Sequence, residues 1–191
     1  MSPLRGLFVC LAIPHGSRRG LTDTAPPGLK LGVSFKSDRS IMSHTYTNLL
    51  DHLVWSTKER RPFIDDRLDT EMHKYLGGTI GELGGSALLV GGMPDHVHVL
   101  AVLPAKRALS DIMREVKANS SGWVHEKFPA LREFAWQTGY GAFTVSQSQK
   151  AKVLDYIAWQ KEHHRVTSFQ DEFVELLKRH EIEYDPKYLW D

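Results

Sequence analysis

Residues 86–103 read SALLVGGMPDHVHVLAVL, and this stretch decides the fold. Ser86 to Val90 is a short apolar run with the composition of a strand, and His96 to Leu103 is a second run of alternating character. Gly91 to Asp95, which separates the two runs, holds two glycines and a proline, residues typical of a turn. We therefore predict two strands that pair as a hairpin.

On the N-terminal side of this hairpin, the sequence predicts a strand and then a helix. Tyr46 to Ser56 is rich in Leu, Val, Tyr and Trp, as a strand is. The helix is indicated by apolar residues at helical spacing, which continue until Gly84-Gly85. These residues are Leu68, Met72, Tyr75, Leu76, Ile80 and Leu83.

On the C-terminal side, Ser110 is a candidate N-cap for a helix that carries Ile112, Met113 and Val116. The elements expected after it are a strand over Ala142 to Ser146, one helix from about Gln149 to His164, and a last helix that begins at Ser168 with a near capping box, Ser168-Phe169-Gln170-Asp171. The order β-α-β-β-α-β-α, followed by the last helix, predicts an α+β fold of the ferredoxin-like, split β-α-β type. We expect an antiparallel sheet with helices packed on one face.

Composition limits the functions that are open to the chain. Its 191 residues, 41% hydrophobic and 25% charged, suit one globular domain with a core. The 24 basic and 23 acidic residues give no indication of a polyanionic partner. A single cysteine, Cys10, excludes an internal disulfide and a cysteine-based zinc site, and fits the reducing cytoplasm. No apolar run approaches the ~20 residues that span a bilayer, so we expect no membrane association. Ten histidines are the unusual feature.

The chain divides near its second methionine. Gly16 to Arg39 is rich in Gly, Pro, Ser, Thr and basic residues without helical or strand periodicity, which is typical of disorder. We predict that residues 1–41 are a disordered N-terminal extension. Residues 42–191 are expected to form the working domain with a C-terminal helical tail, and Met42 is the expected native start.

His96-Val97-His98 is the first candidate for chemistry. Because a strand sends residues i and i+2 to the same face, both imidazoles point together while Val97 turns into the core. Two convergent imidazoles form half of a divalent-metal site. A bare His-x-His is common, so the alternative of one surface histidine beside a chance neighbour stays open at this point.

Tyr156 and Gln160 are the second candidate. Four residues apart on a predicted helix, they share a face and can reach one target. The alternative is an interfacial tyrosine beside a solvated glutamine. Tyr140 is the other candidate nucleophile, disfavoured because no metal-binding side chain lies one helical turn from it.

Taken together and in order, five motifs resemble the single-tyrosine transposases of the His-hydrophobic-His (HUH) nuclease superfamily, of the insertion-sequence and REP-associated type. The motifs are SHTYTN (43–48), STKERRP (56–62), GMPDHVHVL (92–100), WQTGYGAFTVS (136–146) and YIAWQ (156–160). Each motif alone is weak, but their order and spacing are specific. The resemblance covers nearly all of residues 42–191.

The resemblance implies an obligate homodimer that cleaves and rejoins single-stranded, hairpin-forming DNA through a 5′-phosphotyrosine intermediate. By residue-to-residue correspondence it assigns metal binding to His96, His98 and Gln160, and the role of nucleophile to Tyr156. Whether each site is built from one subunit or two is left open. Imidazole and amide ligands with open positions suit Mg²⁺ or Mn²⁺ more than a closed zinc site.

Basic side chains are candidates for phosphate contacts: Lys58, Arg60 and Arg61 after the first strand, and Arg114 and Lys117 on the middle helix. Trp136 or Tyr140 is a candidate for base stacking, although aromatics beside a strand are more often core residues. His163-His164-Arg165 is expected to stabilise a helix C-terminus first and to contact DNA second.

Two other functions remain open on the sequence. One is a non-catalytic module that binds single-stranded nucleic acid, since split β-α-β sheets also serve that purpose. The histidines at the position where such modules carry aromatic residues argue against it. The other is a domesticated endonuclease that cuts repeat hairpins in the host genome, which the sequence does not separate from an active transposase.

Overall fold

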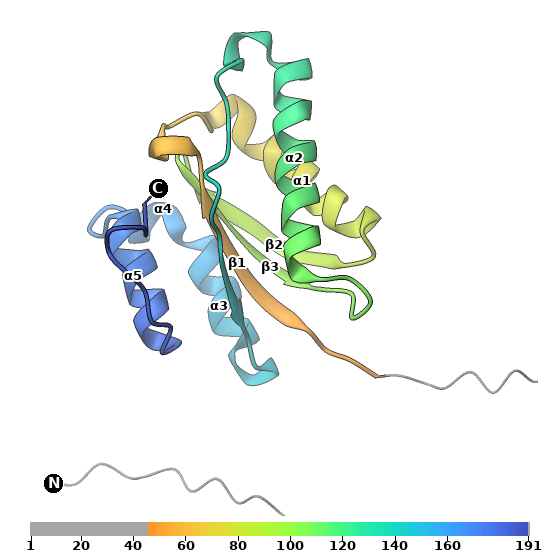
Figure 1. The fold of residues 1–191 in the computed structure, drawn as a ribbon, viewed down its shortest axis with the longest axis vertical. Helices are drawn as coiled ribbons and strands as arrows, with labels where there is room; N and C mark the ends of the chain where they lie inside the picture. The colour runs from red at the N-terminus through yellow and green to blue at the C-terminus, as the bar shows by residue number, and fades with distance from the viewer. Residues whose placement is uncertain (1–45, 191) are drawn as a thin grey trace, which may run out of the picture. The chain divides into compact units, whose positions relative to one another are not determined.

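The computed structural model of the protein describes residues 46–190. The strands are β1 (Leu50–Ser56), β2 (Ser86–Met93), β3 (His96–Val102) and β4 (Gly141–Thr144). The helices are α1 (Asp66–Glu82), α2 (Leu109–Lys127), α3 (Lys150–Ala158), α4 (Gln160–His163) and α5 (Phe169–Arg179). The predicted succession of strands and helices is confirmed, except that two helices, α3 and α4, stand where one was expected (Figure 1). The extension predicted for residues 1–41 and the proposed start at Met42 lie outside the described residues.

The four strands form one antiparallel sheet in the order β2-β3-β1-β4, as the split β-α-β prediction requires. The predicted hairpin of β2 and β3 is confirmed, but its turn is shorter than expected. Gly91, Gly92 and Met93 belong to β2, so Pro94 and Asp95 alone connect the strands. Gly92 has a φ of +152° and an added Cβ there would lie 2.3 Å from the His96 carbonyl oxygen, so this strand end requires glycine.

Helices α1 and α2 cover one face of the sheet and enclose the main apolar core. The helical spacing predicted in α1 is confirmed, because Leu68, Met72, Leu76 and Ile80 are all buried. Asp65 caps this helix by accepting hydrogen bonds from the backbone N–H groups of the first turn. These side chains meet Leu53 and Trp55 of β1 and Val97, Val99 and Ala101 of β3.

The Ser110 N-cap is wrong by two residues. Ala108 has extended backbone angles and the helix begins at Leu109, which places Ser110 inside the first turn. The Ala108 carbonyl accepts from the backbone N–H groups of Asp111 and Ile112, so the helical hydrogen bonds start before Ser110 can cap them. By contrast, the predicted cap of α5 is confirmed, since Ser168 Oγ accepts from the Asp171 backbone N–H at 3.1 Å.

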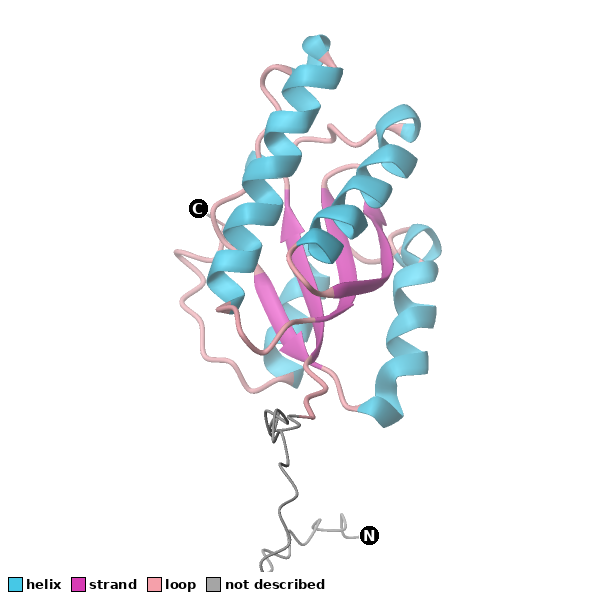
Figure 2. Cartoon of the chain, turned by 90° about the vertical axis from the view of Figure 1, so that its right-hand side faces the viewer, coloured by secondary structure: helices cyan, strands magenta, loops and turns pink. Residues whose placement is uncertain are grey.

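The expectation of helices on one face is wrong, because α3, α4 and α5 pack on the opposite face (Figures 1 and 2). The two central strands bury nearly every residue, and both of their faces therefore need a cover. On this second face the apolar contacts come from Val54, Leu100, Phe143, Ile157 and Leu176, split between two smaller clusters.

The single helix expected from Gln149 to His164 is interrupted at Trp159. This residue leaves the helical region with φ −99° and ψ 18°, and it separates α3 from the short α4. Trp159 is exposed whereas Gln160 is buried, so the break turns the glutamine toward the interior. Among residues 46–190, no helix is both long and apolar enough to cross a bilayer.

Candidate active site

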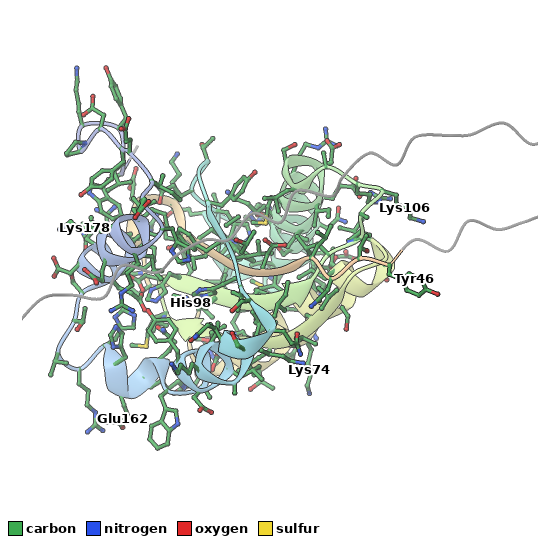
Figure 3. All side chains as sticks on the ribbon, turned by 90° about the horizontal axis from the view of Figure 1, so that it is seen from below. Tyr46, Lys74, His98, Lys106, Glu162 and Lys178 are labelled. Atoms are coloured by element: carbon green, nitrogen blue, oxygen red, sulfur yellow. The ribbon has the colours of Figure 1, made fainter. Side chains whose placement is uncertain are left out.

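His96 and His98 lie on β3, on the face that α3 and α5 cover. Figure 3 labels His98. Both are buried, with exposures of 1% and 0%, whereas Val97 between them belongs to the core on the other face. The predicted alternation is therefore confirmed. Full burial of two imidazoles excludes the interpretation of either as a surface histidine.

Each of these imidazoles is held through its Nδ1 atom. The His96 Nδ1–H donates to Asp95 Oδ1 at 2.7 Å, and His98 Nδ1 shares a hydrogen bond of 2.9 Å with His52 Nε2. The Nε2 atoms of both rings are buried and make no hydrogen bond within the described part of the chain. Histidines that bind metals are arranged this way, with one nitrogen fixed by a neighbour and the other aimed at the ion.

Tyr156 and Gln160 reach the same place from α3 and α4. The Tyr156 ring stands edge-on to the rings of His52 and His98, with centroid separations of 6.0 and 5.9 Å. Gln160 is buried, and its Oε1 atom has no hydrogen-bond partner among residues 46–190. The structure thus brings together all four residues that the sequence singled out.

Gly91 permits this approach of α3 to the sheet. A Cβ atom at this position would lie 2.9 Å from both the Cγ2 and the carbonyl oxygen of Ile157, the residue that follows Tyr156. Any side chain on this residue of β2 would push the helix outward. Gly91, the first glycine of the hairpin sequence, therefore permits the approach of α3, whereas Gly92 is required at the strand end.

Two further residues, Glu172 of α5 and His164, occupy the centre of the site. Glu172 is 3% exposed, and its Oε2 lies 3.1 Å from His164 Nε2, 3.3 Å from His98 Nε2 and 3.8 Å from His96 Nε2. Its Oε1 accepts hydrogen bonds from the Tyr156 hydroxyl and, at 2.9 Å, from Gln160 Nε2. One carboxylate therefore contacts every candidate residue of the site.

Comparison with known proteins identifies the family. The family described as "Transposase IS200 like" matches residues 45–160, more than half of the chain. The chain belongs to the IS200-like transposases. A transposase for insertion sequence element IS200 from Salmonella typhimurium is 30% identical over 139 residues, which cover 68% of this chain and 88% of the relative. The ISDra2 transposase TnpA of Deinococcus radiodurans is 26% identical over 114 residues, 57% of this chain and 81% of the relative.

A solved structure supports the same assignment. The crystal structure of a Deinococcus radiodurans protein assigned as a transposase aligns with a TM-score of 0.52 and 25% identity, over 62% of this chain and 95% of that one. The family resemblance read from the five motifs is therefore confirmed, and with it a DNA transposase fold and class. The match to the family ends at residue 160, so Glu172 and His164 of this transposase lie beyond it.

Electrostatics keep the hydroxyl of Tyr156 protonated while no cation is present. Burial raises the pKa of Tyr156, and the adjacent negative charge of Glu172 raises it further. Burial works against ionisation of Glu172, but the hydrogen bond from His164 and the nearby ring of His98, whose Nε2 lies 3.3 Å from the carboxylate, outweigh it and lower the pKa of this carboxyl. A cation beside the carboxylate would offset the charge that opposes the phenolate.

His52 and His98, which share a hydrogen bond, are neutral at physiological pH. Burial lowers the pKa of His52 to about 3 and that of His98 to about 4. Neutral imidazole is the form that binds a metal. His52 and Asp95 thus hold the rings of His98 and His96 through their Nδ1 atoms, and neither residue was assigned a function by sequence analysis.

The donor set of the site fits a divalent metal ion. Two imidazole nitrogens and an amide oxygen are buried without hydrogen-bond partners in the described chain, and a carboxylate lies among them. Nitrogen and oxygen donors of this kind suit Mn²⁺ or Mg²⁺. Buried polar atoms without partners cost free energy, which an ion would recover.

The predicted phosphate-binding residues of the transposase have other contacts. The Lys117 ammonium donates to the carbonyl oxygens of Gln137, Thr138 and Gly139. Arg61 forms an ion pair with Glu133 at 2.7 Å, and Arg114 forms one with Asp111 at 3.2 Å. The guanidinium of Arg60 lies over the ring of Trp190, and Lys58 is exposed. These contacts are compatible with DNA binding, and they give Lys117 a structural role as well.

Two aromatic candidates lie elsewhere. Trp136 is a core residue that packs edge-on against Trp55, so it is not placed for stacking on a base. Among residues 46–190, Tyr140 has no hydrogen bond or ring contact with His96 or His98, in contrast to Tyr156. Tyr156 also opens on a cavity of about 570 Å³ between β4, α3 and α5, where Lys152 and Arg179 are the basic lining residues.

Proposed function

We propose that this protein is a metal-dependent, single-tyrosine transposase that cleaves and rejoins single-stranded DNA. In this proposal Tyr156 is the nucleophile, and His96, His98 and Gln160 hold Mg²⁺ or Mn²⁺. The observation that carries it is the pair of buried imidazole Nε2 atoms without hydrogen bonds beside the phenol of Tyr156. Membership of the IS200-like transposases supports the action on DNA.

The phenol would act on a phosphodiester. The Tyr156 oxygen attacks the phosphorus, the bond to the 3′ oxygen breaks, and the products are a 5′-phosphotyrosine and a free 3′-hydroxyl. Attack of a 3′-hydroxyl on this linkage reverses the step, releases the tyrosine and joins a new strand without ATP. A bound divalent ion supplies Lewis-acid stabilisation of the charge on the phosphate oxygens.

Single-stranded, hairpin-forming DNA is the proposed substrate. Because this DNA would be inside the cell, the proposed location of the protein is the cytoplasm. Lys152 and Arg179 of the cavity beside Tyr156 are suited to phosphate contacts, together with the candidates Lys58, Arg60, Arg61, Arg114 and Lys117. Because Tyr156 lies beside the histidines of its own chain, the geometry favours a site built within one subunit. The homodimer implied by the family resemblance stays a prediction that sedimentation analysis can test.

A non-catalytic binding module is disfavoured by the same geometry. Such a module presents exposed aromatic side chains on its sheet, whereas this sheet presents buried histidines that face a buried carboxylate of α5. Burial of these polar groups costs free energy, and a module that only binds nucleic acid does not need such buried groups. The domesticated endonuclease keeps the same site, so the genomic surroundings of the gene distinguish it from an active transposase.

The decisive experiment is a search for a covalent adduct. The protein is incubated with labelled single-stranded oligonucleotides and Mg²⁺ or Mn²⁺, and the mixture is denatured. We expect an adduct with the native protein and with Tyr140→Phe, and none with Tyr156→Phe or in the presence of a chelator. His96→Ala should lose the adduct through loss of metal. An adduct formed by Tyr156→Phe would show that the nucleophile is another residue.

A further inference from the structure

We propose that Glu172 and His164 are ligands of the same metal centre, so that the C-terminal part of the chain completes it. This inference rests on the proposed function, because it adds residues to the site in which Tyr156 acts. Both residues lie beyond residue 160, where the family match ends. Neither is part of the five motifs that identify the family.

The spacing of the donor atoms is that of ligands around one ion. Metal–ligand bonds of about 2.1 Å place neighbouring ligand atoms about 3.0–3.4 Å apart in octahedral or tetrahedral geometry. Glu172 Oε2 lies 3.1 Å from His164 Nε2, 3.3 Å from His98 Nε2 and 3.8 Å from His96 Nε2. One donor atom from each of the four residues lies within 4.8 Å of the others. Only small side-chain movements separate this arrangement from a coordinated one.

The hydrogen bonds of the imidazoles also fit a cation at this point. His96 Nδ1 donates to Asp95 Oδ1 at 2.7 Å, so the neutral form of this ring carries its lone pair on Nε2, which lies 3.8 Å from Glu172 Oε2. His164 Nδ1 is directed at the Thr167 carbonyl oxygen at 2.8 Å, and without a metal its Nε2–H donates to Glu172 Oε2 at 3.1 Å. A divalent ion would replace the proton on His164 Nε2 and supply the positive charge between the rings and the carboxylate.

The two carboxylate oxygens of Glu172 contact different groups. Oε2 faces the imidazoles, while Oε1 accepts from Gln160 and from the hydroxyl of Tyr156. Gln160 thereby orients the carboxylate in addition to offering its own Oε1 atom. The carboxylate links the ion to the nucleophile, and it makes α5 a positioning element for Tyr156.

The identity of the ion follows from the donors. A set of imidazoles with one carboxylate suits Mn²⁺ and Zn²⁺ better than Mg²⁺, which prefers oxygen ligands and its own water. We therefore expect Mn²⁺ to bind more tightly than Mg²⁺. Mn²⁺ is also the convenient probe, because its binding can be followed both by calorimetry and by magnetic resonance.

The test is a titration of the full chain with MnCl₂, comparing Glu172→Gln with Glu175→Gln. Glu175 lies on the same helix, is exposed and pairs with Arg179, so it is the matched control. We expect Glu172→Gln to weaken Mn²⁺ binding about tenfold or more, and the control to stay within about twofold of the native protein. Equal or tighter binding by Glu172→Gln would overturn the inference and make Glu172 a side chain that competes with the ion.

A second measurement covers the case in which Glu172→Gln does not fold, as judged by circular dichroism. Electron–nuclear coupling in the native protein with bound Mn²⁺ counts the coordinating imidazole nitrogens. Three would support His164 as a ligand and two would contradict it. Failure of the proposed function has a separate signature: an adduct formed by Tyr156→Phe leaves these metal-binding results unchanged.

Discussion

The two faces of the sheet are built from the same strands and have opposite characters. On β3, Val97, Val99 and Ala101 point into an apolar core, while His96 and His98 point into a polar site that is equally buried. On β1, Leu53 belongs to the core and the adjacent His52 supports the site. Burial alone therefore does not identify a core. Buried apolar side chains form the core on one face, whereas equally buried polar side chains form the site on the other face.

The difference has an energetic meaning. Apolar burial on the α1 and α2 face contributes stability of about 25 cal/mol per Å². Imidazoles and a carboxylate buried on the α3 and α5 face lose hydration that their mutual hydrogen bonds replace only in part. We infer that the first face holds the domain together and that the second face is stabilised chiefly when its ligand is bound.

The largest expected effect is a loss of stability on the apolar face. Leu53→Ala removes a fully buried side chain and should lower the free energy of unfolding by about 2–5 kcal/mol, measured by denaturant titration. The adduct yield per folded molecule should stay near that of the native protein. A Leu53→Ala protein that is folded yet fails to form the adduct would show that the two faces are not independent.

Gly91→Val should damage the site with a smaller effect on the core. The added side chain meets Ile157 and displaces α3, so Tyr156 moves away from the histidines and the rate of adduct formation falls about 100-fold. Gly122→Ala on α2 is the control, since no atom lies within 4 Å of an added Cβ there. Native rates for Gly91→Val would mean that the nucleophile tolerates a shift of its helix.

Acid should weaken the polar face through His52 and His98. Their pKa values, about 3 and about 4, are lower than the ordinary value of 6.5, so the unfolded chain binds more protons than the folded one between pH 6.5 and pH 4. Stability of the metal-free protein should therefore fall as the pH is lowered through this window, by up to about 1.4 kcal/mol per pH unit for each histidine.

Replacing one of these histidines provides the check. His52→Gln removes one titrating ring, so unfolding in a chelating buffer should depend less steeply on pH. The same substitution should weaken Mn²⁺ binding about tenfold, because His98 loses the partner of its Nδ1 atom. A pH dependence as steep as that of the native protein would place the responsible protons on other residues.

The smallest expected effect is on the salt dependence of DNA affinity, which should change more for a substitution on the α3 and α5 face than for one on the α1 and α2 face. Lys152→Gln in the cavity beside Tyr156 should lower the slope of log affinity against log salt by about 1, measured with a labelled single strand. Arg114→Gln on α2 should lower it by less, because α2 covers the other face. Equal losses would mean that the strand also crosses α2, as the sequence-based assignment of Arg114 supposes.

Local patterns predicted much of this structure. The alternation of β3 located the histidine pair and the opposite core, and the capping box located the start of α5. Tyr156 contacts the ring of His98, and Gln160 joins the same site through Glu172, although a helix break at Trp159 lies between them. Such features depend on residues that are close in the chain, which is why the sequence reveals them.

The rest depends on contacts between distant segments. Glu172 is one of many acidic residues on helical surfaces, and nothing adjacent to it in the sequence indicates that it is buried. His164, expected at a helix C-terminus, gains its position from Glu172 and Thr167. His52 becomes recognisable once the strand register is known, since its strand neighbour Val54 pairs with His98. The second layer of helices likewise follows from tertiary packing.

The position of Glu172 after Tyr156 in the chain bears on how the protein is made. A ribosome delivers the strands, the histidine pair and the tyrosine first, and the carboxylate that contacts them emerges later. A nascent chain that has not yet released α5 therefore has an open and incomplete centre. Activity on DNA would then begin only after α5 has left the ribosome, which separates synthesis of the strands and Tyr156 from their first encounter with a substrate.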